Sequence, residues 1–395
     1  MRIVHVLTRL LRAGSEENTI ATCLWQARAG HDVTVLHGPG ADPFWEETHG
    51  QSISFVEVPS LVHPIHPVQD MRAVSELRKL YRDLEPDVIH THQSKAGILG
   101  RLAASSVPSA LRVHGIHIIP FDGVSAAKAR FYVWAEKLVA RHTDLFISVS
   151  RSVGQAYVDA GICRRVEPVY SGMPLAPFRN PEPPEDWRDL LAMEDGDDRA
   201  PVAILMLAAY EPRKRHVEFL EAYAKVLPEL PPNRLLFAGK GPHEPQVRQA
   251  VEDLGLTERV TFCGYRSDPH ALIGLADICI LTSEREGLPR VVVQYIAAGR
   301  PVIVADLPGI EEIVKHEVNG LVSDPADMND TAGKLRDLLA NRDHLAALAT
   351  GARETDVSEW DLERLGARTT ELYLESLQSL PKSRRSPSTV PATLS

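Results

Sequence analysis

The sequence predicts an α/β protein with two doubly wound, parallel-sheet domains. Its 395 residues are too many for one ordinary core and suit two domains of roughly 150–200 residues each. Apolar residues make up 44% of the chain, which is enough for a core in each domain. Short apolar runs alternate with helix-length stretches in two successive series, and a segment rich in proline and acidic residues separates them.

The first domain is expected over residues 1–172. It opens with a β-α-β unit, in which a strand at 3–8 and a strand at 32–37 flank a helix that Gly30 ends. Such a unit implies a parallel sheet. Further strands are expected at 53–58, 87–92, 111–114, 145–149 and 166–170, and helices at 16–29, 71–83, 95–105, 125–141 and 153–160.

The second domain is expected over residues 173–360. The irregular stretch 174–199 breaks the alternation and is expected to cross from one domain to the next. Strands are expected at 202–208, 234–238, 260–263, 278–281, 301–305 and 320–322, and helices at 217–226, 244–254, 270–275, 289–298 and 309–314. Residues 361–380 hold a last helix that is expected to pack back on the first domain. The tail 381–395, rich in Ser, Thr and Pro, is expected to be disordered.

Composition excludes several classes of protein. The formal charge is −10 and no dense basic stripe occurs, so nucleic acid is not an expected partner. The four cysteines lie far apart without a C-x-x-C pair, which favours buried small side chains over a metal or disulfide role. No apolar run reaches the ~18 residues of a membrane span. The opening residues MRIVHVLTRL form a strand without a basic leader, so a cytoplasmic location is expected.

A candidate ligand site follows the strand at 278–281. Gly287 would let the backbone approach a ligand closely, and Pro289 suits a first helical turn, where its missing N–H costs nothing. The free N–H groups of that turn favour an anion such as a diphosphate. Glu286 would repel phosphate if unpaired, so it is better explained as an acceptor for sugar hydroxyls. Taken alone, this carboxylate could equally be one that simply complements the helix dipole.

The segments around Glu286 favour a ligand site over a carboxylate that only complements the helix dipole. The run SEREGLPRVVVQYIAAGRPVIVAD resembles the donor-binding segment of glycosyltransferase family 4, the retaining enzymes of the GT-B fold. MRIVHVLTRLLRAGSEENTI is similar to the family's N-terminal glycine loop, and PDVIHTHQSKAGILGRLAA and VYSGMPLAPF are similar to two later blocks. The resemblance covers nearly all of the expected folded chain. It implies two facing Rossmann-like domains with a cleft between them, an acceptor-side domain first and a nucleotide-sugar domain second.

The resemblance also implies roles for residues of the second domain. Glu286 matches the first carboxylate of the family's E-x7-E motif, which contacts the donor sugar, while Gln294 stands where a second carboxylate usually holds the ribose. Lys214 matches the lysine that neutralises the diphosphate, and Ala209 replaces the arginine usually paired with it. The site thus lacks one cation and one anion, which leaves its formal charge unchanged.

The resemblance likewise implies roles for residues of the first domain and for the nucleobase site. Gly14 and Ser15 match a glycine pair that approaches the donor phosphate, and His114 matches a histidine near the transferred sugar. Tyr265 and Arg266 stand where the family's backbone holds the nucleobase. The expected catalytic residues are His114, Lys214 and Glu286, and the expected substrate-binding residues are Gly14, Ser15, Arg213, Lys214, Tyr265, Arg266, Glu286, Gly287, Leu288, Pro289, Arg290 and Gln294.

Charge then suggests the mechanism. A departing nucleoside diphosphate gathers negative charge, so Lys214 and the helix start at 288–290 are expected to stabilise it. Arg213 or Arg215 could replace the missing cation, or both could be ordinary loop charges. No protein nucleophile is assigned, and the leaving phosphate is the expected base for the acceptor hydroxyl. No acidic D-x-D metal site is evident, so no metal or other cofactor is expected.

Two further patterns leave alternatives open. His90 and His92 alternate on a strand like a metal pair, but without a third ligand they are interpreted as satisfied polar groups. The helix at 128–141 mixes four cations with Phe131, Tyr132 and Trp134, and could either lie on an anionic membrane or pack on the sheet. Peripheral contact with the inner membrane is therefore an open expectation, and the oligomeric state is not indicated.

The predicted activity is transfer of a hexose or N-acetylhexosamine from a nucleotide sugar, expected to be UDP-linked, to a glycan or lipid-linked glycan. The segment SKAGILGRLAA, which looks most like the polysaccharide-assembly branch of the family, suggests this acceptor. Alternatives are a nucleotide-sugar 2-epimerase of the same architecture and a non-catalytic sugar-nucleotide binder. A Rossmann dehydrogenase is disfavoured because the first strand–helix turn lacks G-x-G-x-x-G.

Overall fold

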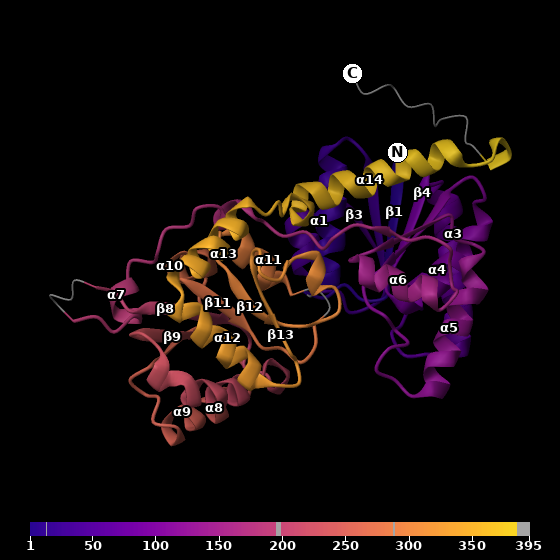
Figure 1. Ribbon diagram of the computed structural model, residues 1–395. Helices are drawn as coiled ribbons and strands as arrows, with labels where there is room; N and C mark the ends of the chain where they lie inside the picture. Colours follow the sequence, from indigo (N-terminus) through magenta and orange to yellow (C-terminus); the bar gives the residue numbers. More distant parts are fainter. Residues whose placement is uncertain (13, 195–198, 287–288, 385–395) are drawn as a thin grey trace. The chain divides into compact units, whose positions relative to one another are not determined.

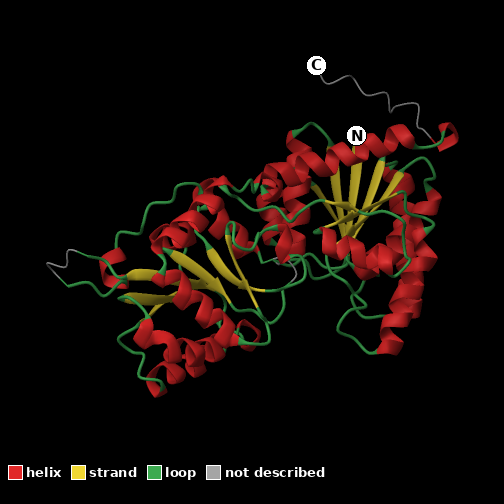
Figure 2. Ribbon diagram, viewed as in Figure 1, coloured by secondary structure: helices red, strands yellow, loops and turns green. Residues whose placement is uncertain are grey.

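The computed structural model describes residues 1–12, 14–194, 199–286 and 289–384, which form two compact units. One unit holds Met1–Gly172 together with the chain from Glu359 onward, and the other holds Met173–Ser358. Each unit is a parallel sheet with helices on both faces (Figures 1 and 2). The two parallel-sheet α/β domains predicted from the sequence are therefore confirmed.

The first unit contains seven parallel strands in the order β3-β2-β1-β4-β5-β6-β7. Their bounds are β1 Arg2–Leu7, β2 Asp32–His37, β3 Ser54–Glu57, β4 Val88–His92, β5 Leu111–Ile116, β6 Leu145–Ser148 and β7 Glu167–Pro168. β1 and β4 are neighbours although two strands and three helices lie between them in the chain, with His5 opposite His90 in the register. The central strands are buried on both faces, as parallel strands between helix layers should be.

The helices of this unit are α1 Gly14–Arg28, α2 Phe44–His49, α3 Pro67–Leu84, α4 Ser94–Ala103, α5 Ala126–Ala140, α6 Arg151–Asp159 and α14 Leu362–Ser379. The last of these, α14, packs against α1 and the sheet, where Leu365 and Tyr373 join the core around Ile3. Gly366 permits the close approach, because a Cβ there would lie 2.4 Å from the Cβ of Trp25. The segment expected at 361–380 thus lies within the first unit.

The second unit contains six parallel strands in the order β10-β9-β8-β11-β12-β13. The strands are β8 Val202–Leu207, β9 Asn233–Ala238, β10 Val260–Gly264, β11 Ile278–Leu281, β12 Val302–Ala305 and β13 Gly320–Ser323. The helices are α7 Trp187–Leu190, α8 His216–Val226, α9 Glu244–Asp253, α10 Pro269–Leu275, α11 Arg290–Ala297, α12 Met328–Ala340 and α13 Arg342–Glu354. Both sheets therefore have the 3-2-1-4-5-6 strand order of doubly wound domains, with a reversal of direction at one point.

One predicted helix is wrong. The stretch 309–314 forms only a 3₁₀ turn at Ile310–Glu312, because Gly309 adopts a left-handed φ of 85° and Asn319 donates a side-chain hydrogen bond to the Ile313 carbonyl at 3.0 Å. That bond closes the turn before the chain reaches β13. The helices α2, α12 and α13 were not anticipated from the sequence pattern.

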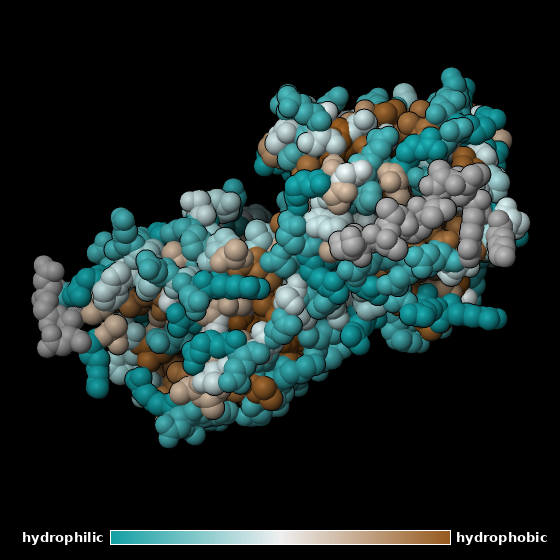
Figure 3. All heavy atoms as spheres, turned by 90° about the horizontal axis from the view of Figure 1, so that it is seen from above, coloured by the Kyte–Doolittle hydropathy of each residue, from teal (hydrophilic) through white to brown (hydrophobic). Residues whose placement is uncertain are grey.

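The surface seen in Figure 3 is mostly hydrophilic, with apolar side chains scattered between charged ones. Among the helices that the structure describes, none combines the length and the apolar character required to cross a bilayer.

Candidate active site

In the second unit, the direction of strand order reverses between β8 and β11, which pair in parallel. Ligands of doubly wound sheets bind beyond the carboxyl ends of the strands at such a point. The loop after β8 carries the 3₁₀ turn Pro212–Lys214, and the loop after β11 carries Glu286. Two segments 72 residues apart in sequence, each singled out from the sequence, thus meet at the switch point.

Glu286 is the centre of a charged cluster at this point. Its Oε1 accepts hydrogen bonds from Lys214 Nζ and, at 3.1 Å, from Arg213 Nη1. The side chains of Lys214 and Glu286 are only 11% and 13% exposed, whereas that of Arg213 is 34% exposed. Arg213 also donates from Nε to Glu211 at 2.6 Å. We call Glu211, Arg213, Lys214 and Glu286 the switch-point cluster, and its formal charges sum to zero.

The loops that carry the cluster are fixed to each other. The Glu284 amide donates to the Arg213 carbonyl at 2.8 Å, and the Thr282 hydroxyl donates to the Lys214 carbonyl at 2.7 Å. The chain leaves the turn through Arg215, which adopts a left-handed φ of 57°. Arg215 bonds the Pro325 carbonyl and lies 3.6 Å from Glu218, so Arg213, and not Arg215, contacts the cluster.

The helix α11 begins beside this loop. Pro289 precedes its first residue, Arg290, and Gln294 lies half-buried one turn later. The Tyr295 hydroxyl accepts a hydrogen bond from the Leu207 amide at 2.9 Å and so ties α11 to the end of β8. Gly287 and Leu288 lie outside the described residues.

The positions expected at the nucleobase differ in their surroundings. Tyr265 follows β10 and is 70% exposed, with Lys240 Nζ 4.7 Å from its ring centroid. Arg266 instead binds two carboxylates, donating to Asp268 at 2.8 Å and to Asp186 at 2.7 Å. These partners raise the pKa of Arg266, and its side chain links β10 to the residues just before α7.

In the first unit, Gly14 begins α1 and Ser15 donates to Glu16 at 2.5 Å. The other carboxylate oxygen of Glu16 accepts from the Gln93 side chain at 3.1 Å. Gln93 in turn accepts from the Thr8 amide at 3.0 Å, so the start of α1 is anchored to the end of β4.

His114 lies inside the first unit rather than at an open edge. It is only 2% exposed, and its Nδ1 lies 3.1 Å from Thr91 Oγ1. Its ring packs under α4, where a Cβ on Gly97 would come within 2.5 Å of it. Burial and the nearby Arg101 charge lower the pKa of His114. His117, three residues later, instead lines a pocket with His92 and is a residue that the sequence reasoning missed.

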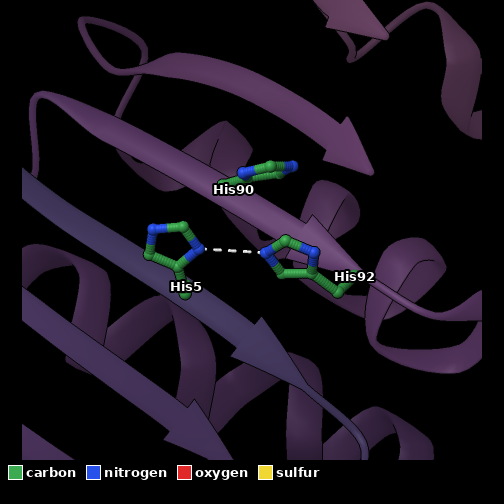
Figure 4. Close-up of side chains that lie close together, drawn as sticks. All are labelled: His5, His90 and His92. Carbon is green, nitrogen blue, oxygen red and sulfur yellow. Dashed lines mark hydrogen bonds between the residues drawn. The ribbon is translucent and has the colours of Figure 1, made fainter. Parts of the chain in front are cut away.

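A histidine cluster lies in the same unit. His90 and His92 of β4 lie close to His5 of β1, and one ring nitrogen from each is within 4.8 Å of the others (Figure 4). The third imidazole that the sequence did not reveal is thus His5. These three residues are a set that could hold a metal ion, but His5 Nδ1 and His92 Nε2 are already hydrogen-bonded to each other at 2.9 Å. Burial lowers the pKa of all three well below the usual value, to about 4 for His5.

The family models and named relatives that match this chain are glycosyltransferases, as the sequence resemblance implies. Residues 195–355 match the family model described as glycosyl transferases group 1, and residues 14–172 match the one described as a glycosyl transferase 4-like domain. A protein of Bacillus subtilis (strain 168) named as a glycosyltransferase, EpsD, is 29% identical over 84% of this chain and 86% of its own. The UDP-Gal:alpha-D-GlcNAc-diphosphoundecaprenol alpha-1,3-galactosyltransferase of Escherichia coli is 25% identical over 95% of this chain and 97% of its own.

Solved structures show the same fold. A glycosyltransferase from Rickettsia africae ESF-5 superimposes with a TM-score of 0.78 at 19% identity, covering 96% of this chain and 99% of the other. Anabaena HepE in complex with UDP gives a TM-score of 0.75 at 21% identity, covering 96% and 100%. Two family models in the expected order, named relatives along nearly the whole chain and the shared fold lead to one conclusion. The chain belongs to the GT-B glycosyltransferases of the family 4 kind and is an enzyme that transfers a sugar.

Proposed function

We propose that this enzyme transfers a hexose or N-acetylhexosamine from a UDP-linked donor to a glycan or lipid-linked glycan, with retention of the anomeric configuration. The observation that carries the proposal is the switch-point cluster, in which two cations and the Glu286 carboxylate meet beyond β8 and β11. A nucleotide sugar needs both kinds of group, cations for its diphosphate and a carboxylate for its sugar hydroxyls. The name of the Escherichia coli relative, with its UDP-sugar donor and lipid diphosphate acceptor, supports the choice of substrates.

The roles of the residues follow from their charges. The bond between the sugar's anomeric carbon and the diphosphate oxygen breaks, and Lys214 and Arg213 stabilise the negative charge that gathers on the departing UDP. Glu286 accepts hydrogen bonds from the sugar hydroxyls. The acceptor hydroxyl forms the new bond on the same face of the sugar, and its proton passes to the leaving phosphate. We assign no covalent protein nucleophile.

We also propose that transfer requires no metal ion, because Lys214 and Arg213 already supply the positive charge that a divalent cation would bring to the diphosphate. Activity should survive dialysis against EDTA. A dependence on added Mg²⁺ or Mn²⁺ would refute this part of the proposal.

The test is a panel of UDP-sugars incubated with the protein and a lipid extract that contains glycan-linked lipids, read by mass spectrometry. The proposal expects a product heavier than the acceptor by one sugar residue, and its NMR coupling constants should show a retained linkage. Lys214→Ala should abolish most of the signal, and Lys225→Ala, an exposed lysine on α8, is the matched control. An isomerised nucleotide sugar without transfer would instead identify an epimerase.

A last part of the proposal places the protein on the cytoplasmic face of the membrane. The helix α5 exposes Phe131, Trp134 and Leu138 by 50%, 59% and 40%, at the i, i+3, i+7 spacing of one helical stripe. Four exposed cations surround this stripe: Lys128, Arg130, Lys137 and Arg141. The acid of the helix, Glu136, is buried against Arg101 at 2.7 Å, so the outer face is wholly basic and apolar. This combination suits an anionic lipid surface.

Co-sedimentation with vesicles tests the membrane contact. The protein should bind vesicles that contain phosphatidylglycerol and should be released by salt, while pure phosphatidylcholine should retain little of it. The variant Phe131→Ser/Trp134→Ser should lose binding. Equal binding by this variant and by the unchanged protein would exclude α5 as the contact.

A further inference from the structure

Three imidazole rings gather on one face of the sheet in the first unit. His90 and His92 alternate on β4, so both side chains point to the same face, and His5 lies opposite His90 in the register of the neighbouring strand β1. One ring nitrogen of each lies within 4.8 Å of the others, and all three residues are at most 4% exposed (Figure 4). The sequence pattern offered only a pair of histidines, and the fold supplies the third.

Two of the rings are also held by residues outside the group. His5 Nε2 bonds the Gln26 side-chain oxygen at 2.9 Å, and His90 Nδ1 bonds the Tyr373 hydroxyl at 2.5 Å. A histidine that binds a metal uses one nitrogen for the ion and normally bonds a second residue through the other, which fixes the orientation of its ring. His5 and His90 therefore already have the outer partners that metal-binding rings need.

The second nitrogen of His90 is unpartnered. His90 Nε2 is buried and bonds no group in the described part of the chain. Gly115 keeps a space free beside it, because a Cβ at that position would lie 2.8 Å from His90 Nε2 and 3.0 Å from His92 Nδ1. A cavity of about 40 Å³ borders all three of these residues, which is room enough for a water molecule. His90 can thus bind an ion without giving up a hydrogen bond, and the group has space to adjust.

The hydrogen bond between His5 and His92 determines how far the rings must move. Their facing nitrogens, His5 Nδ1 and His92 Nε2, are 2.9 Å apart. Two imidazoles bound to one Zn²⁺ by bonds of about 2.0–2.1 Å lie about 3.3–3.4 Å apart in tetrahedral geometry. An ion therefore replaces this hydrogen bond and separates the two nitrogens by about 0.4–0.5 Å, while His90 moves inward.

The available ligands also select the kind of metal. Imidazole nitrogens suit Zn²⁺, Ni²⁺ and Cu²⁺, whereas Mg²⁺ and Ca²⁺ require oxygen ligands. None of the residues that line the cavity carries a carboxylate. Three histidines and one water molecule form a known coordination sphere of Zn²⁺, so the absence of an acid does not exclude this ion.

We propose that His5, His90 and His92 form a binding site for one Zn²⁺, or a similar divalent ion that prefers nitrogen, with a water molecule in the cavity as the fourth ligand. The ion bridges the neighbouring strands β1 and β4 and stabilises the first unit, because it binds only when the strands are paired. The positive charge for the diphosphate is supplied by Lys214 and Arg213 of the second unit, so this ion takes no part in transfer.

Metal binding can be measured on the full chain without any substrate. After treatment with a chelator, the protein is titrated calorimetrically with Zn²⁺ or with Mg²⁺. One Zn²⁺ per chain should bind, and Mg²⁺ should not. At a free Zn²⁺ concentration a hundredfold above Kd, the unfolding temperature of the first unit should rise by about 5–10 °C. Absence of stoichiometric Zn²⁺ binding, or equal binding of Mg²⁺, would overturn the proposal.

The position of the ion is tested in two ways. X-ray absorption of Zn²⁺ bound to the unchanged protein should show three imidazole ligands, and a shell with fewer would place the ion elsewhere. His90→Gln should weaken Zn²⁺ binding by more than about tenfold. The matched control is His316→Gln/His344→Gln, which removes two partly exposed histidines beside Glu317 in the second unit and should leave the affinity unchanged. Undiminished binding by folded His90→Gln protein, or loss of binding in the control, would refute the assignment. If His90→Gln does not fold, the ligand count on the unchanged protein decides.

Discussion

Replacing Glu286 by glutamine separates the effect of its carboxylate on UDP binding from its effect on sugar transfer. The structure places this carboxylate in contact with Lys214 and Arg213, so the change raises the formal charge of the switch-point cluster from zero to +1. Glutamine keeps the length of the side chain and one carbonyl acceptor. Lys214 and Arg213 then donate to a neutral amide oxygen instead of a carboxylate, so each bond loses its ion-pair character and weakens by about 1–2 kcal/mol. Because the pair is slightly exposed, the expected loss of folding stability is about 1–2 kcal/mol in total.

Although Glu286→Gln should weaken the cluster, it should preserve or strengthen the binding of UDP. Its diphosphate meets one additional net positive charge, so UDP should bind as tightly as before or up to about tenfold more tightly, equivalent to about 1.4 kcal/mol. Transfer should fall by about 10²–10³-fold, since the sugar hydroxyls lose their charged acceptor. Glu286→Gln should therefore raise or preserve product affinity while it lowers kcat.

Isothermal titration with UDP and initial rates with the donor measure the two quantities. Glu284→Gln is the matched control, because Glu284 is an exposed carboxylate two residues away, and its bond to the Arg213 loop is made by the backbone amide, which the change retains. If UDP affinity falls more than tenfold in a folded Glu286→Gln protein, the carboxylate acts on the diphosphate and the assigned role is wrong.

Three further predictions concern the same two units. Lys214→Ala should lower kcat/KM by about 10²–10³-fold in steady-state assays, and a near-normal value in a folded variant would remove Lys214 from the site. Gln294→Glu should tighten donor binding up to about tenfold, more so with Ala209→Arg, and strictly additive KM changes would exclude compensation between the two positions. Because burial lowers the folded-state pKa of His5 to about 4, the unfolded chain binds more protons below pH 6.5. The stability of the first unit should thus be constant above that pH and fall by roughly 3 kcal/mol toward pH 4, as hydrogen exchange would show, and a pH-independent stability would contradict the burial argument.

The sequence predicted the features that depend on local pattern. Alternation of strands and helices identified both parallel sheets, because a buried parallel strand is a short apolar run and its crossover is a helix. The same pattern located the two loops of the candidate site, since loops after β8 and β11 both leave the carboxyl edge of one sheet. Glu286 could thus be singled out from the pattern and Lys214 from the family resemblance, but their direct contact could not be predicted, because it joins residues 72 positions apart.

Features that depend on which way a side chain points were harder to predict. His114 and His117 are three residues apart near the end of β5, so the alternation of an extended chain sends them to opposite faces of the sheet. One lies under α4 and the other in the pocket, a distinction that requires the register of the strand. His5 was missed for a related reason: its link to His92 spans 87 residues and exists only because β1 and β4 are neighbours in the sheet.

The contact between Glu286 and Lys214 also answers an objection that the sequence raised, namely that a carboxylate beside a phosphate site should repel its ligand. Here the carboxylate is already neutralised by the cations that the diphosphate would use. A diphosphate that approaches Lys214 competes with Glu286 for the same ammonium protons, and each bond that it takes leaves the carboxylate oxygen free for a sugar hydroxyl. Binding of the diphosphate to Lys214 therefore also releases the Glu286 carboxylate, which can then accept a hydrogen bond from the donor sugar. The Glu286 carboxylate weakens binding only of a diphosphate that carries no sugar, because no hydroxyl then takes up the released oxygen. The site therefore favours the intact nucleotide sugar over the UDP product.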